Sequence, residues 1–120
     1  MSKKILIVDD HPDIVKMLVR KLRKIGWEYE TAENGEIGVQ KALELQPDLI
    51  LMDMQMPVMD GREAVRRLRK KGFTGKISAL TASVLNQELE QLIKDGFDYY
   101  ITKPIDKSFI SQLKEILGTD

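Results

Sequence analysis

Three aspartates stand at the ends of two strongly apolar runs of the sequence. Asp9 and Asp10 close the run KKILIVDD, and Asp53 closes the run PDLILMD. A strand that is apolar on both faces is typical of the middle of a parallel sheet, and ligands bind beyond the carboxyl ends of such strands. We therefore expect the three carboxylates to meet at one edge of a sheet.

Bringing three carboxylates together has an electrostatic cost. Each charged pair about 4 Å apart repels by roughly 4 kcal/mol at an effective dielectric of about 20. A hard divalent cation with oxygen ligands would offset this repulsion. An aspartate before Pro12 could instead serve as a turn and helix N-cap, but two in tandem facing a third favour the cation site. The pattern predicts a magnesium-dependent site that accepts a phosphoryl group.

The candidate acceptor is Asp53, which is followed by MQMPVMDG. Pro57 and Gly61 predict a tight loop that leaves Asp53 exposed above the sheet. The nucleophile in phosphoryl transfer need only be an oxygen placed in line, with its charge compensated by metal and cations. A carboxylate meets this requirement and would form an acyl phosphate.

Three other residues fall close to the same predicted edge. Thr81 ends the run ISALT, and Lys103 follows the run YYIT. Each is unremarkable alone, but a threonine hydroxyl would point at the carboxylates and a lysine would supply the missing positive charge. His11 is the only histidine, and we expect it to be a solvent-facing neighbour of the acidic pair rather than a metal ligand.

Five short apolar segments alternate with five segments of helical period. This alternation, with one helix per crossover, predicts an α/β fold with a doubly wound parallel sheet. The predicted strands are Ile5–Val8, Trp27–Ala32, Leu49–Met52, Ile77–Leu80 and Tyr99–Ile101. The predicted helices begin at Pro12, Gly35, Arg62, Leu85 and Phe109, and stop at Gly26, Leu45, Lys71, Gly96 and Gly118. In the fourth helix we expect Leu85, Leu89, Leu92 and Ile93 to face the core.

Composition limits the possible functions. The chain has 120 residues, enough for one domain with its own core, and no cysteine for disulfide, zinc or thiol chemistry. Lysine and arginine number 19, as do aspartate and glutamate, which argues against direct nucleic-acid binding. We expect the basic runs RKLRK and RRLRKK to be solvated helix faces. No apolar run is long enough for membrane insertion, and the N-terminal run is too short for a signal peptide, so a cytoplasmic protein is expected.

These residues together resemble the receiver domain of two-component response regulators. The resemblance rests on Asp9-Asp10, Asp53 in LILMDMQMPVMDG, Thr81 in LTA and Lys103 in TKP, and it covers the whole chain. The loop sequence is similar to receivers of hybrid histidine kinases and to single-domain, chemotaxis-type regulators. The resemblance implies that residues 1–120 form a single receiver domain, with a flavodoxin-like fold of five strands and five helices in strand order 2-1-3-4-5.

The resemblance also implies a role for each site residue. Asp53 would be the phosphoacceptor, assisted by Thr81 and Lys103, and the bond between Lys103 and Pro104 would be cis. Asp10, Asp53 and the backbone carbonyl of Gln55 would bind Mg²⁺ directly, with Asp9 acting through water. Thr81 and Tyr100 would form the switch that changes the surface of the fourth helix, fifth strand and fifth helix. Gln55 and Ser83 stand where the family varies, and both affect how long the phosphoryl group persists.

The function implied is a phosphorylation-controlled signalling switch. Its donor would be a histidine kinase or histidine phosphotransfer protein, and its target an effector protein or a fused domain. Such a protein is no enzyme toward a separate substrate, although it catalyses its own phosphorylation and dephosphorylation. It would be a monomer or a weak, phosphorylation-dependent dimer.

Three alternatives remain. An aspartate-nucleophile phosphatase of the haloacid dehalogenase type also uses aspartate and Mg²⁺, but it carries a second aspartate where this chain has Gln55. A flavodoxin-like electron carrier shares the fold, yet no phosphate loop rich in serine, threonine and glycine follows the first apolar run. A receiver that cannot be phosphorylated is disfavoured by the full set of acceptor and metal residues.

Overall fold

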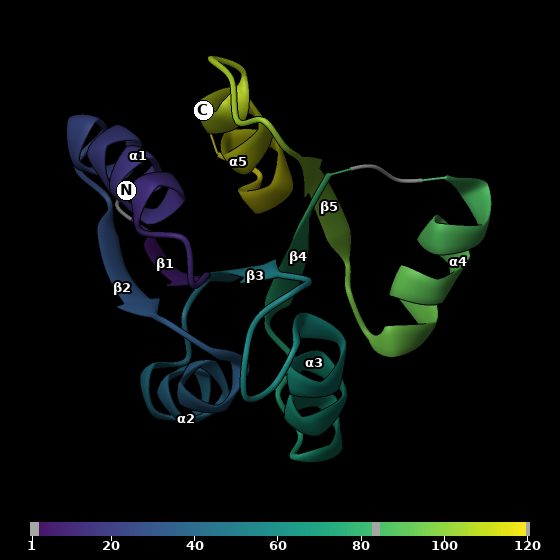
Figure 1. Cartoon of the computed structure of the whole chain (residues 1–120). Coiled ribbons are helices and arrows are strands. Elements are labelled where there is room, and N and C mark those ends of the chain that lie inside the picture. Colours follow the sequence, from purple (N-terminus) through teal and green to yellow (C-terminus); the bar gives the residue numbers. More distant parts are fainter. Residues whose placement is uncertain (1–2, 83–84, 120) are drawn as a thin grey trace.

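A parallel sheet of five strands forms the middle layer of the protein, between two layers of helices (Figure 1). The computed structural model describes residues 3–82 and 85–119. The sheet has the order β2-β1-β3-β4-β5, as predicted. Its strands are β1 (Lys4–Val8), β2 (Glu28–Ala32), β3 (Leu49–Asp53), β4 (Lys76–Thr81) and β5 (Tyr99–Thr102). The helices are α1 (Pro12–Lys24), α2 (Gly35–Leu45), α3 (Gly61–Lys70), α4 (Asn86–Asp95) and α5 (Phe109–Leu117).

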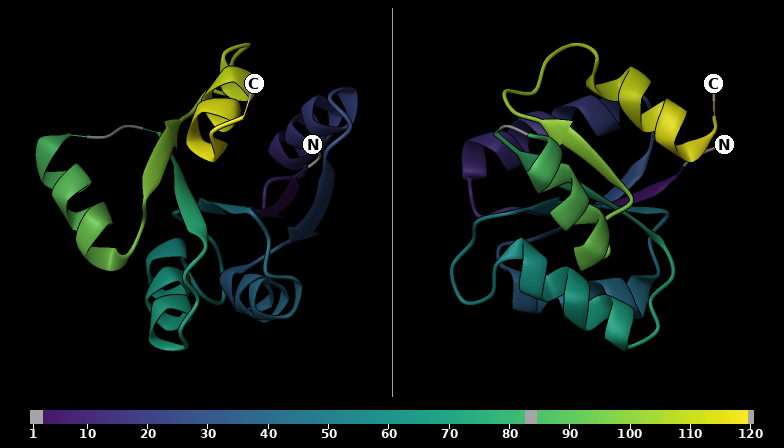
Figure 2. Two further views of the ribbon diagram at one scale, coloured as in Figure 1. Left: turned by 180° about the vertical axis from the view of Figure 1, so that it is seen from behind. Right: turned by 90° about the vertical axis from the view of Figure 1, so that its right-hand side faces the viewer.

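The central strands are buried on both faces, which explains their unbroken apolar runs. Alternate side chains of β1 and β3 enter two separate cores. In one core, Ile7 and Leu51 meet α1 and α5; in the other, Val8 and Met52 meet α2 and α3. The right-hand view of Figure 2 shows these helix pairs on opposite sides of the sheet. Burial of each such side chain stabilises the fold by roughly 1.5–3 kcal/mol, so the central strands hold the residues at their carboxyl ends in place.

The helix that differs most from the sequence expectation is α4. Of its predicted inward residues, Leu92 is buried, whereas Leu85 is 68% exposed and Ile93 is 63% exposed. Figure 1 shows the reason, because α4 lies beside β5 at the edge of the sheet and packs mainly against α3. A helix in that position can bury only a narrow stripe, so the expectation for Leu85 and Ile93 is wrong.

The second basic run is also more than a solvated helix face. Arg66 donates from Nε and Nη2 to Oδ1 of the buried Asp95, at 2.9 and 2.6 Å. Arg69 donates to three backbone carbonyls, including that of Gly96, and to the Asp98 carboxylate at 2.8 Å. These bonds fasten the C-terminal end of α4 to α3. Within the described part of the chain, no helix has both the length and the apolar character needed to cross a bilayer.

Candidate functional site

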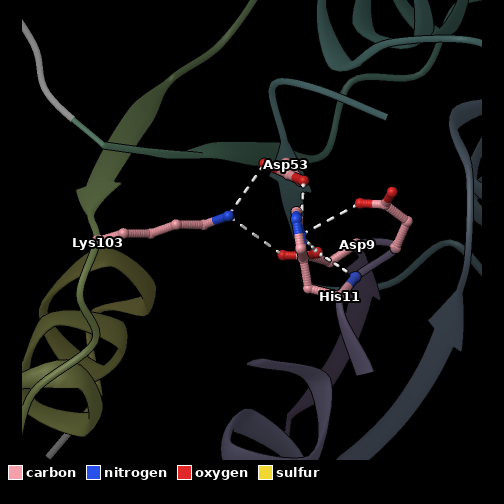
Figure 3. Close-up of polar contacts among 5 residues, drawn as sticks. Asp9, His11, Asp53 and Lys103 are labelled. Atoms are coloured by element: carbon pink, nitrogen blue, oxygen red, sulfur yellow. Dashed lines mark hydrogen bonds and ion pairs between the residues drawn. The ribbon is translucent and has the colours of Figure 1, made fainter. Parts of the chain in front are cut away.

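The carboxyl ends of β1 and β3 bring the predicted acidic residues together. Val8 pairs with Met52 in the parallel register, so the residues that follow them, Asp9 and Asp53, lie side by side. The Asp9 amide donates to the Ala32 carbonyl at 3.0 Å, which holds the start of the turn after β1 against β2. Figure 3 shows the carboxylates converging from these two strand ends.

Both central carboxylates are buried. Asp9 is 2% exposed and Asp53 is 4% exposed, whereas Asp10 is only partly covered. The expectation that the loop leaves Asp53 exposed is therefore wrong. The covering groups include Lys103 and His11, which come from other loops and approach the Asp53 carboxylate from two sides.

Lys103 supplies the positive charge that the carboxylates lack. Its Nζ donates to Asp53 Oδ1 at 3.1 Å and lies 3.5 Å from Asp9 Oδ2. The Lys103 backbone amide donates to the Thr81 carbonyl at 2.7 Å, and the bond from Lys103 to Pro104 is cis, as expected. This backbone path aims the lysine across the sheet edge toward Asp53.

His11 is exposed and lies beside the acidic pair, as expected, and its ring also contacts the acids. Its side chain is 55% exposed, yet its Nδ1 lies 2.8 Å from Asp9 Oδ1, 3.2 Å from Asp10 Oδ1 and 3.6 Å from Asp53 Oδ2. The His11 backbone amide also donates to Asp9 Oδ1, at 2.9 Å. The negative potential of the cluster favours this inward orientation of the ring nitrogen.

Several oxygens of the cluster lack hydrogen bonds. Among the described residues, the buried atoms Asp9 Oδ2, Asp10 Oδ1 and Asp53 Oδ2 have no hydrogen-bond partner. Ligand atoms from Asp9, Asp10, His11 and Asp53 all lie within 4.8 Å of one another. Buried polar atoms without a partner are rare, and an ion is one explanation for them. These oxygen donors fit a hard divalent cation such as Mg²⁺.

Electrostatics at the site favour added positive charge. Burial, followed by the Asp9 charge, raises the pKa of Asp53, although the hydrogen bond and charge of Lys103 oppose this rise. The hydrogen bond that His11 Nδ1 donates to Asp9 Oδ1 is the main cause that raises the pKa of His11, with further support from the charges of Asp9, Asp10 and Asp53. The surroundings of Asp53 thus disfavour the ionised form of its carboxyl group.

The metal-free protein should therefore lose stability as the pH rises. A raised pKa for His11 gives stability that is complete below its unfolded value of about 6.5 and is lost as the pH passes through the folded pKa. A raised pKa for Asp53 acts in the same direction, because its ionisation is harder in the folded state. In EDTA, we expect the melting temperature to fall as the pH rises above ~6.5, because the pKa of folded His11 is raised above that value. His11→Asn should flatten that part of the curve, and a flat wild-type curve would contradict the assignment.

A cavity of about 560 Å³ adjoins the cluster and carries charged groups that sequence reasoning missed. Arg62 of α3 and Glu88 of α4 lie in its wall, and no spacing in the sequence links them to the strand ends. Its lining is His11, Asp53, Met54, Gln55, Asp60, Arg62, Leu80, Thr81, Ala82, Glu88, Leu92 and Lys103. The structure thus brings Thr81 and Gln55 to the site. Ser83 lies outside the described residues.

Tyr100 is placed elsewhere. Its side chain is 43% exposed and lines a separate apolar groove between α4 and α5. The structure does not bring it to the acidic cluster, and any link to Thr81 would run along neighbouring strands, which pair Thr81 with Thr102.

Backbone hydrogen bonds hold the loop after β3 in place. The Gly61 amide donates to the Met54 carbonyl at 3.2 Å, and the Gly35 amide donates to the Met59 carbonyl at 3.1 Å. Gly61 itself packs directly on the Asp53 carbonyl oxygen, so closely that no side chain fits between them. The backbone that carries the Asp53 carboxylate is thereby held in one position.

Comparison with known proteins gives a consistent result. The family model for the response regulator receiver domain matches residues 5–115. Protein PilH of Pseudomonas aeruginosa is 38% identical over 87% of this chain and 88% of its own length. The rice two-component response regulator ORR41 is 38% identical over 87% of this chain and 85% of its own.

Other relatives are longer. The Bacillus subtilis alkaline phosphatase synthesis transcriptional regulatory protein PhoP is 37% identical over 98% of this chain. The chain spans 49% of that relative, and it spans 11% of the Escherichia coli sensor histidine kinase RcsC, with which it is 32% identical over 90% of its length.

Solved structures show the same fold. Vibrio cholerae chemotaxis protein CheY4 superposes with a TM-score of 0.89 at 28% identity, covering 97% of this chain and 99% of that one. The receiver domain of sensor histidine kinase PA1611 from Pseudomonas aeruginosa has a TM-score of 0.86 at 30% identity, covering 99% of this chain and 100% of that one. The latter structure holds a magnesium ion in its active-site cleft.

Proposed function

Since this chain belongs to the response regulator receiver domain family of two-component signalling, we propose that Asp53 is its phosphoacceptor. The donor is a phosphohistidine on a histidine kinase or a histidine phosphotransfer protein. The observation that carries the proposal is the Asp53 carboxylate itself: it ends a central strand, contacts Lys103 at 3.1 Å and opens into a cavity large enough for a phosphoryl group.

Transfer needs little from the protein beyond positioning and charge. An Asp53 oxygen forms a bond to phosphorus while the phosphorus–nitrogen bond to the donor histidine breaks, and the histidine leaves as neutral imidazole after taking a proton. Lys103 pairs with one phosphoryl oxygen, and the Thr81 hydroxyl donates to another. The same residues act when the chain catalyses its own dephosphorylation by water.

The site fits Mg²⁺, which would offset the negative charge of the carboxylates and the incoming phosphoryl group. Asp10, Asp53 and the Gln55 backbone carbonyl are the direct ligands in this proposal, and Asp9 acts through water. The unpartnered oxygens of Asp10 and Asp53 support it.

Mixing the protein with acetyl phosphate and Mg²⁺ tests the function. We expect mass spectrometry to show the addition of one phosphoryl group, labile to hydroxylamine as an acyl phosphate is. EDTA should prevent the addition. A phosphoryl group that is stable to hydroxylamine, or no addition at all, would argue against an aspartyl phosphate.

Magnesium binding should depend more on Asp10 than on Asp9. The Asp10 carboxylate is more exposed than that of Asp9, so a metal ion bound to it can keep several of its water ligands. The Asp9 carboxylate is already engaged, because it accepts a hydrogen bond from the His11 backbone amide. Calorimetric titration of Asp10→Asn and Asp9→Asn should show at least a ~10-fold larger loss of affinity for the former. Equal losses would count against a direct role for Asp10 alone.

Phosphorylation should alter Thr81 and Tyr100 together and reshape the face formed by α4, β5 and α5. The new dianionic group attracts the Thr81 hydroxyl and Lys103, and this attraction shifts the equilibrium between two conformations of that face. Hydrogen exchange with and without beryllofluoride, a phosphoryl mimic, should show changed protection in α4 and β5. Unchanged protection there would indicate a passive phosphate carrier.

The proposal extends to the domain organisation, location, assembly and output of the protein. Residues 1–120 act as a single receiver domain in the cytoplasm, as a monomer or a weak dimer that phosphorylation strengthens. The output is an effector protein or a fused domain rather than direct contact with nucleic acid.

A further inference from the structure

His11 places a nitrogen atom among the oxygens of the acidic cluster. Figure 3 shows its ring nitrogen directed at the carboxylates of Asp9 and Asp53. The distances from Nδ1 to the nearest oxygens of Asp9, Asp10 and Asp53 are 2.8, 3.2 and 3.6 Å. One ring nitrogen therefore lies next to all three acids.

These spacings match those of atoms that share a metal ion. Ligand atoms about 2.0–2.2 Å from a metal are separated by roughly 2.9–3.6 Å in octahedral and tetrahedral geometry. The three distances fall within or at the edge of this range, and the shortest of them is a hydrogen bond between Nδ1 and Asp9 Oδ1 that a bound cation would replace. A cation could therefore contact Nδ1 and the carboxylates after small rotations of the side chains.

A second observation points to a cation at this place. The side chains of Asp9 and Asp53 are 0% and 6% exposed, and each has one oxygen without a hydrogen bond among the described residues. Lys103 Nζ donates to Asp53 Oδ1 and lies 3.5 Å from Asp9 Oδ2, so its hydrogen bond does not reach either of these two atoms. The cluster thus contains buried acceptors that a cation would satisfy.

The ring nitrogen changes which cation the cluster prefers. Mg²⁺ takes oxygen ligands and keeps several waters, whereas imidazole suits Zn²⁺, Co²⁺ and other first-row transition metals. We propose that His11 is a metal ligand through Nδ1 and gives this site a preference for such transition metals over Mg²⁺. This inference rests on the metal site of the proposed function and adds a specificity to it.

The experiment uses Co²⁺ and Mg²⁺ as probes on the whole chain. Because carboxylates alone also bind Co²⁺ more tightly than Mg²⁺, the informative quantity is the ratio of the two affinities. We expect His11→Gln to lower the affinity for Co²⁺ by about 10-fold or more and to leave that for Mg²⁺ within about 2-fold. Asp13→Asn, which removes an exposed acid at the start of α1, is the matched control and should leave both affinities unchanged.

An NMR spectrum of the Co²⁺ form tests the bond between His11 and the metal ion directly. The chain has one histidine, so a paramagnetically shifted imidazole N–H resonance in the Co²⁺ form can arise only from His11. We expect this resonance to disappear in D₂O and to be absent from His11→Gln. Its absence from the wild type, or an equal loss of Mg²⁺ and Co²⁺ affinity in the variant, would overturn the inference.

A failure of the inference about His11 can be distinguished from a failure of the proposed function. If His11 is no ligand, acetyl phosphate should still modify the wild type in the presence of Mg²⁺, and only the metal preference is wrong. If the proposed function fails, that modification is absent whatever the Co²⁺ spectrum shows.

Discussion

Asp53→Asn is expected to abolish phosphorylation by acetyl phosphate and to stabilise the metal-free protein. The first effect follows because Asp53 is the carboxylate that contacts Lys103 and lines the cavity together with Thr81. The second follows because burial and Asp9 raise the pKa of Asp53, so its ionised form opposes folding at neutral pH. Loss of the Lys103 contact cancels part of the gain, which leaves a net stabilisation on the order of 1 kcal/mol.

Two measurements on one variant check this prediction. Mass spectrometry should show no added phosphoryl group, and urea unfolding in EDTA should show a higher midpoint than the wild type. Asp13→Asn controls for the loss of an acid outside the site and should change neither result. If Asp53→Asn still gains a phosphoryl group, another residue is the acceptor; if its midpoint falls, the Lys103 contact outweighs the repulsion.

The sequence was sufficient to predict the sheet and the meeting of the acids. Runs such as ILIV and LILM are apolar on both faces, which only a central parallel strand requires, and parallel strands put their carboxyl ends on one edge. Asp9 and Asp53 therefore had to be neighbours, and Lys103 and Thr81 had to be near. The boundaries of the elements differ from expectation by at most two residues, where helix and strand ends are least determined.

The missed features depend on contacts between segments far apart in the sequence. Arg66 and Asp95 are separated by 29 positions, and only the placement of α4 beside α3 joins them. The exposure of Ile93 has the same origin, because periodicity shows which helix face is apolar but not whether another element covers it. The inward turn of His11 depends on side-chain torsions and on the summed field of the carboxylates. Neither these long-range contacts nor the side-chain torsions can be read from the spacing of residues in the sequence.

Gly61→Ala is expected to destabilise the protein strongly although it adds only one methyl group. A Cβ at this position would overlap the carbonyl oxygen of Asp53, and it would lie 3.1 Å from the Asp53 carbonyl carbon and from Met52 Cγ. The obstacle is mostly backbone of a central strand, which cannot rotate away as a side chain can. We expect a loss of about 2–4 kcal/mol in the free energy of unfolding, measured by urea denaturation.

The same substitution should also impair the site, because relief of the overlap has to move α3 or Asp53. Displacement of a reacting group by about 1 Å can cost on the order of 100-fold in rate, so phosphorylation by acetyl phosphate should slow even where the variant remains folded. Arg67→Ala, an exposed change in the same helix that breaks only the ion pair with Glu63, should alter stability by no more than ~0.5 kcal/mol and leave the rate unchanged. A Gly61→Ala variant that loses stability but phosphorylates at the wild-type rate would show that α3 moves and Asp53 does not. A variant that loses neither would show that the loop after β3 adapts freely, and that the position of the acceptor is fixed by β3 and Lys103 alone.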